Sequence, residues 1–123
     1  HCIKNKLNLK RAEEIIISAA KQTGRSFFPK VYEPTNLQTW LLNHHEGSSF
    51  ACHINGKKSI NDLVGNDNSV INIIIGPEGD FSKQELNQFQ EAKIELVNLS
   101  PRRLRSESAA IVSIANVIQI MEY

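Results

Sequence analysis

The chain has 123 residues, of which 41% are hydrophobic and 22% charged, and its formal net charge is +1. This is the composition of one soluble globular domain with a single core. The near-neutral charge favours neither a nucleic-acid nor a membrane partner. No apolar run is long enough to cross a membrane, and no signal-peptide pattern opens the chain. Cys2 and Cys52 form no CxxC pair, so we expect reduced thiols in a cytoplasmic protein.

The first predicted element is a helix over residues 12–22. Apolar residues recur at i, i+1, i+4 and i+5 from Ile15, which places them on one helical face, and Gly24 is a typical helix stop. The next stretch, SFFPKVYEP, is expected to be extended, because Pro29 and Pro34 cannot lie inside a helix.

A second helix is expected over residues 36–43, because Thr35 and Gln38 match a capping box. The segment SSFACHI, residues 48–54, is typical of a strand, and Asn55-Gly56 is a turn signal. The polar stretch that follows is expected to form a loop or a short helix.

The clearest strand covers residues 70–75. Its near-continuous apolar run predicts burial on both faces, as in a parallel sheet. A capping box of Ser82 and Glu85, supported by a hydrophobic staple, starts a helix over residues 82–92.

The chain closes with a strand over residues 94–99 and a helix over residues 106–121. The helix is apolar almost all round, so it is expected to be largely buried. Strands that alternate with helices indicate an α/β fold, with a mainly parallel sheet flanked by helices.

The loop GPEG, residues 76–79, is the first candidate site. Pro77 and Gly79 suit positions i+1 and i+3 of a type I turn, so one interpretation is purely structural. The other is that backbone groups at the carboxyl end of the strand hold a ligand, as in open α/β sheets. Glu78 and Asp80 then argue against a polyphosphate, although both also favour a helix N-terminus.

Standard phosphate and metal motifs are absent. The Gly56-Lys57 pair lacks the other Walker A residues, and no glycines fall at the GxGxxG spacing. GPEG matches the GXXG of a KH domain formally, but Glu78 would repel a nucleic-acid phosphate. No metal is expected, because no standard zinc spacing is matched by His44, His45, Cys52 and His53.

The second candidate site is NLSPRRLRSESAA, residues 98–110, another strand-loop-helix segment. Arg102, Arg103 and Arg105 stand close together beside Glu107. The segment is either a solvated basic loop or an edge that faces RNA, since arginine donates bidentate hydrogen bonds to phosphates and base edges.

These segments resemble a known family. IIIGPEGDFSKQE is similar to GPEGGFS-x-x-E, and LSPRRLRSESA to LG-x-RILR-x-ETA, of the RsmE-type methyltransferases. These are 16S rRNA uracil-N3 methyltransferases of the SPOUT superfamily. AAKQTGRSFFPKV resembles the family stretch A-x-EQ-x-x-R-x-x-x-P, which places Gln22, Arg25 and Pro29. The segments keep their order over nearly the whole chain.

The chain departs from the family pattern at a few positions. Asp80 and Ser100 each replace a glycine, Arg103 replaces an isoleucine and Ser108 a threonine. Glycine reaches positive φ freely and serine does not, so the exchange at Ser100 bears on the local backbone.

The resemblance implies an α/β domain with a deep C-terminal trefoil knot. Residues 1–123 would form a single, partial SPOUT methyltransferase domain. The family's N-terminal PUA-like RNA-binding domain and the start of the knotted domain are expected to be missing from it. A homodimer is also implied, with the last helix in the knot and the dimer contact.

The resemblance also implies that the two loops bind S-adenosylmethionine, whose sulfonium tolerates nearby acids. Arg102 and Arg25 would face the substrate RNA. Arg105, Arg25, Glu78 and Glu107 are the candidate catalytic residues. The cofactor-binding residues would be Ile75, Gly76, Pro77, Glu78, Gly79, Leu99, Ser100, Arg103, Leu104 and Arg105.

The implied function is methyl transfer to N3 of a uracil in 16S rRNA of the small ribosomal subunit, without metal. Two alternatives stay open. One is another SPOUT methyltransferase that acts on a different rRNA or tRNA position. The other is a non-catalytic module for RNA binding or assembly, for which the exchanges at Asp80 and Ser100 are the sequence support.

Overall fold

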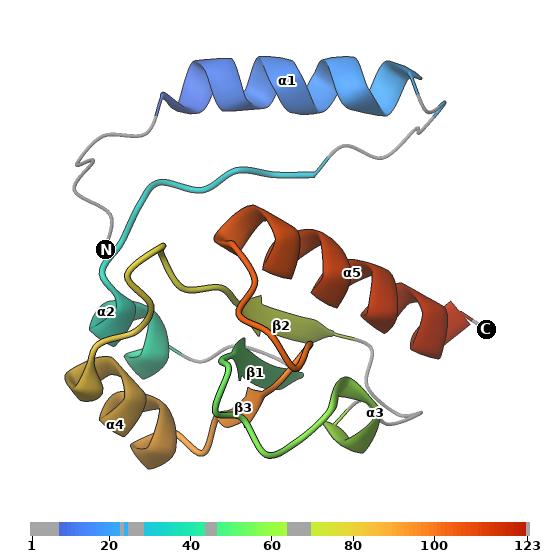
Figure 1. Cartoon of the computed structure of the whole chain (residues 1–123). Helices are drawn as coiled ribbons and strands as arrows, with labels where there is room; N and C mark the ends of the chain where they lie inside the picture. Colours follow the sequence, from blue (N-terminus) through green and yellow to red (C-terminus); the bar gives the residue numbers. More distant parts are fainter. Residues whose placement is uncertain (1–7, 23, 25–28, 44–46, 64–69, 123) are drawn as a thin grey trace.

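Three parallel strands form the centre of the computed structural model, which describes residues 8–22, 24, 29–43, 47–63 and 70–122 (Figure 1). They are β1 (Ser48–Cys52), β2 (Ile71–Ile74) and β3 (Glu95–Val97), in the spatial order β2-β1-β3. In the register of the sheet, Phe50 of β1 aligns with Ile73 on one side and Glu95 on the other. The prediction of an α/β fold with a parallel sheet is confirmed.

Helices cover both faces of this sheet. The helices of the described residues are α1 (Leu9–Gln22), α2 (Leu37–Leu42), α3 (Ile60–Leu63), α4 (Lys83–Glu91) and α5 (Ser106–Glu122). Side chains alternate across β1, so Phe50 and Cys52 pack on one face with residues of α3 and α5. Ala51 packs on the other face with residues of α2 and α4.

The prediction that residues 70–75 are buried on both faces is wrong. Every residue of β2 is only half-buried, whereas Phe50 and Ala51 of β1 are fully buried. The physical reason is the strand order: β1 has a neighbour on each side, while β2 lies at an edge of the described sheet.

Helix α5 is also less buried than its composition predicts. Ala109, Ser113 and Val117 form its buried stripe. The opposite stripe is between 42% and 69% exposed, although it is apolar; it consists of Ile111, Ile114, Ile118 and Met121. With about 3.6 residues per turn, the helix can press only one face against the sheet.

Local capping signals decide the helix starts. Asn8 accepts the N–H of Arg11, so α1 begins earlier than predicted. Helix α2 is capped by Asn36, whose Oδ1 accepts the N–H of Thr39 at 2.7 Å, so the assignment of Thr35 as the cap is wrong. The helix stop at Gly24 is confirmed by its φ of 71°.

No helix of the described residues is long and apolar enough to span a membrane.

Helix α4 starts as its sequence predicts. Ser82 Oγ accepts the N–H of Glu85 at 3.1 Å, and Glu85 Oε1 accepts the N–H of Ser82 at 2.8 Å. Phe81, just before the cap, stacks edge-on against Phe89 with a centroid distance of 4.9 Å. This start holds the end of the preceding loop in place.

Candidate functional site

A cavity of about 460 Å³ opens at the carboxyl ends of the three strands. Its walls are the segments that follow β1, β2 and β3, together with the start of α5. This is where open α/β sheets bind ligands, and the volume is in the range of small-molecule sites. The lining residues are Cys52, His53, Ile54, Ile75, Gly76, Pro77, Glu78, Asp80, Asn98, Leu99, Ser100, Arg102, Arg103, Leu104, Arg105, Ser106 and Ala109.

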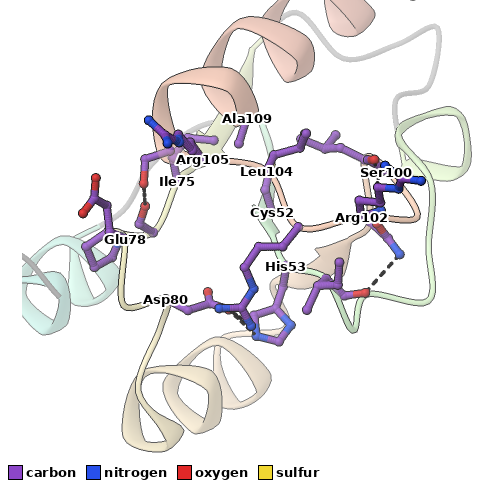
Figure 2. A pocket seen from close by; sticks show the side chains of 17 residues that line it. Cys52, His53, Ile75, Glu78, Asp80, Ser100, Arg102, Leu104, Arg105 and Ala109 are labelled. Atoms are coloured by element: carbon purple, nitrogen blue, oxygen red, sulfur yellow. Dashed lines mark hydrogen bonds and ion pairs between the residues drawn. The ribbon is translucent and has the colours of Figure 1, made fainter.

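The structure brings the two candidate loops together in this cavity. Figure 2 shows Glu78 and Arg105 on one side of it, and Ser100 and Arg102 on the other. Every expected cofactor-binding residue lines the cavity except Gly79. Glu107 does not line it either; it is exposed in the first turn of α5. Arg25 lies outside the described residues.

The loop after β2 turns one residue later than predicted. The N–H of Asp80 donates to the carbonyl of Pro77 at 2.8 Å, which places Glu78 and Gly79 at the corner. The expected type I turn over residues 76–79 is therefore wrong. The residue that needs a left-handed backbone is Asp80, with a φ of 65°, and Ser100 is not among the residues with positive φ in the described chain.

The loop after β3 is held by side-chain hydrogen bonds. Asn98 donates from Nδ2 to the carbonyl of Ile54, and its Oδ1 accepts the N–H of Ser100; both distances are 3.0 Å. Ser106 Oγ donates to the carbonyl of Gly76, which joins the start of α5 to the other loop. The two loops are thus fixed to each other and to the end of β1.

Charged groups gather at the rim of the cavity. Glu78, Arg102, Arg103 and Arg105 are all exposed. Among the described residues, the carboxylate of Asp80 lies against the ring of His53 and pairs with the guanidinium of Arg103. The described residues contain no group of three or more His, Cys, Asp or Glu side chains that could hold a metal ion.

Sequence reasoning missed the contribution of β1 to the cavity. Cys52, His53 and Ile54 line it because they end the central strand. No motif marks them, and the only signal is that the loop after a parallel strand lies at the ligand-binding edge of the sheet. Asn98 and Ser106 lie within the second candidate segment, and no motif marks their hydrogen-bonding roles either.

Cys52 ends β1 in the wall of the cavity, and its side chain is buried. Burial raises the pKa of its thiol from 9.0 to about 11, and a hydrogen bond with Ser113 acts in the opposite direction. The folded-state pKa lies above the unfolded value. The stability that the neutral thiol contributes is therefore fully present below about pH 9 and is lost as the pH rises through about 11.

We expect alkylation of Cys52 by iodoacetamide at pH 8 to be about a hundredfold slower than that of an exposed cysteine, because the thiolate fraction is that much smaller. Mass spectrometry of a Cys2→Ser background gives the rate. Ser18→Cys, at an exposed position of α1, supplies the exposed reference. Equal alkylation rates for Cys52 and for the cysteine at position 18 would contradict the raised pKa of Cys52.

The chain belongs to the RNA methyltransferase domain family, whose model matches residues 1–118. Among curated relatives, it is 33% identical over 115 residues to ribosomal RNA small subunit methyltransferase E of Mesomycoplasma hyopneumoniae. That match covers 90% of this chain and 48% of the relative. The resemblance to the RsmE-type methyltransferases is confirmed.

Solved structures agree with this assignment. A methyltransferase E of Neisseria gonorrhoeae bound to S-adenosyl methionine matches with a TM-score of 0.84 and 32% identity, over 92% of this chain and 48% of that one. A Legionella pneumophila protein described as a methyltransferase, in complex with SAM, matches with a TM-score of 0.90 and 26% identity. That match covers 98% of this chain and 52% of the Legionella chain. The chain thus spans about half the length of these relatives.

Proposed function

We propose that this chain is the methyl-transferring part of an S-adenosylmethionine-dependent enzyme that methylates N3 of a uracil in 16S rRNA. The observation that carries the proposal is the meeting of both family loops in one cavity at the carboxyl ends of the strands. Its support from relatives is the name shared by the methyltransferase E proteins and the cofactor bound in the Neisseria structure.

The cavity residues fit this cofactor. Ile75, Leu99 and Leu104 offer apolar surface for an adenine ring, and the loops offer backbone N–H and C=O groups. A Cβ on Gly76 would lie 3.2 Å from the Phe81 ring, so the backbone there is closely packed. Glu78 at the rim suits a ligand that carries a positive sulfonium rather than phosphates.

The bound cofactor supplies the methyl group and its leaving group. The protein has to hold an unstacked uracil against it and assist the loss of the N3 proton. Arg105 and Arg102 would bind RNA, and Arg105 would stabilise the uracil anion; the support is that both side chains line the cavity and are exposed. An arginine is not a base at neutral pH. Of the two candidate acids, Glu78 lines the cavity and Glu107 does not, so Glu78 is the proposed proton acceptor. Arg25 and Glu107 remain candidates for the roles predicted from the sequence.

Calorimetry with S-adenosylhomocysteine tests the cofactor assignment. We expect the intact protein to bind one equivalent per chain, and no detectable binding would reject the proposal. The target position is tested separately, by nuclease digestion and mass spectrometry of methylated rRNA. A methyl group at another rRNA or tRNA position would favour the alternative SPOUT activity over uracil N3.

We also propose that the protein is a cytoplasmic homodimer and that the chain forms a deep trefoil knot, preceded in the full protein by a PUA-like RNA-binding domain. Support for the dimer comes from the exposed apolar stripe of α5, formed by Ile111, Ile114, Ile118 and Met121. An apolar surface of this kind on a soluble protein marks an interaction site.

Replacing Ile118 with aspartate is expected to convert a dimer to monomers, because a charge in a desolvated apolar contact is costly. Light scattering coupled to size exclusion measures the mass. Ser18→Asp, which adds the same charge to an exposed position of α1, should leave the mass unchanged. A dimer that survives Ile118→Asp would place the contact elsewhere.

A further inference from the structure

Asp80 joins three segments of the cavity wall through one carboxylate. Its Oδ1 accepts the N–H of Phe81 at 2.8 Å, within its own loop. Its Oδ2 lies 3.2 Å from Nε2 of His53, at the end of β1, and 3.8 Å from Nη2 of Arg103, in the loop after β3. Figure 2 shows Asp80 and His53 facing each other at one end of the cavity.

The His53 ring is held from both sides. The N–H of Asn55 donates to its Nδ1 at 3.1 Å, and its Nε2 lies 3.2 Å from Oδ2 of Asp80. With Nδ1 as the acceptor, Nε2 is the nitrogen that carries a hydrogen, so the positive side of the ring faces the carboxylate. The side chain of His53 is only 8% exposed, which shields the contact from water. Asn55 and Asp80 together therefore define the orientation of the ring.

The backbone of Asp80 is in the left-handed region, with a φ of 65°. Aspartate enters this region more readily than most residues with a Cβ, but less readily than glycine. Glycine, the residue of the family segment, would adopt it without strain. Arg103, another of the departures from the family segments, is in contact with Asp80. Strain of this kind at a ligand site is a pointer to function.

We propose that Asp80 is a positioning residue that fixes His53 and Arg103 in the cavity wall and so preorganises the site for the cofactor. The proposal rests on the function proposed above. Asn98 and Ser106 already fix the backbones of the three segments that form this part of the wall, so the shared carboxylate would act on the side chains of His53 and Arg103, which without it would have to be ordered when the ligand binds. Ordering on binding lowers affinity.

The test is Asp80→Gly in the intact protein, with S-adenosylhomocysteine as the probe. We expect Kd to rise about tenfold, as for the loss of one polar contact with a charged group. The midpoint of thermal unfolding should change little, because relief of the positive φ offsets much of the lost contact. Asp80→Asn should lie between glycine and the wild type, since asparagine tolerates this φ and keeps an acceptor facing His53 but loses the charge that attracts Arg103.

Lys93→Gly is the matched backbone control. Lys93 has a φ of 61°, is exposed and does not line the cavity, so glycine there relieves the same strain without touching the site. Its Kd should equal that of the wild type. Adding His53→Ala to Asp80→Gly should cost no further affinity, because the two residues act as one unit.

An unchanged Kd for Asp80→Gly, or additive losses with His53→Ala, would overturn the proposal. If the wild type itself does not bind the probe, the proposed function fails, and amide hydrogen exchange in the ligand-free protein decides the positioning role. Exchange in residues 98–105 that is faster in Asp80→Gly than in Lys93→Gly supports it. Equal exchange in the two variants overturns it.

Discussion

Arg105→Ala is expected to lower methyl transfer to unmethylated 30S subunits by about 10²- to 10³-fold, the usual loss when a group that stabilises developing charge is removed. Arg105 lines the cavity directly before α5, and its carbonyl accepts the N–H of Ala109 at 2.8 Å. Its backbone is therefore fixed while its side chain is exposed at the rim. Incorporation of a labelled methyl group into 16S rRNA measures the rate.

The same variant should keep its fold and most of its affinity for S-adenosylhomocysteine, because the cofactor is proposed to bind largely through backbone groups. Arg105→Lys, which keeps the charge but loses the planar fork, should lie between alanine and wild type. Arg11→Ala, at an exposed position of α1, is the control for a lost surface charge. Full turnover by Arg105→Ala would mean that another residue stabilises the uracil anion.

Phe50→Ala is expected to lower the free energy of unfolding by about 3–5 kcal/mol, the typical cost of truncating a buried phenylalanine. Phe50 is 0% exposed in the central strand and packs with Val97 of β3 and Val117 of α5. Natural domains are stable by only about 5–15 kcal/mol. The variant should therefore unfold at much lower urea concentration, which circular dichroism can follow.

Tyr32→Ala is the matched control for that loss. Tyr32 is 76% exposed in the extended segment before α2, so its truncation should change stability by less than about 0.5 kcal/mol. A loss below about 1 kcal/mol for Phe50→Ala would contradict its place at the centre of the core.

Signals that act over a few residues were predictable. The Ser82–Glu85 box starts α4 as expected, because all its partners lie within one helical turn. Where two neighbouring residues can both cap a helix, the sequence does not decide which of them does so. Thr35 and Asn36 are both good caps, and the chain uses Asn36. The turn after β2 likewise lies one residue later than predicted, with Glu78 and Gly79 at its corner.

Burial could not be read from composition alone. The apolar run of residues 70–75 predicts a strand correctly, but its depth depends on its place in the sheet, and β2 lies at an edge. In α5 the apolar residues exceed what one contact face can cover. The excess is left exposed on the stripe that contains Ile114 and Ile118.

The sequence by itself determined the alternation of strands and helices, the two loop segments and the family to which they belong. Only the tertiary structure decided that His53 joins those loops and that the carboxylate of Asp80 lies against both His53 and Arg103. These residues are far apart in the chain and carry no shared motif. Their meeting depends on the strand order β2-β1-β3, which long-range packing sets and local propensity does not.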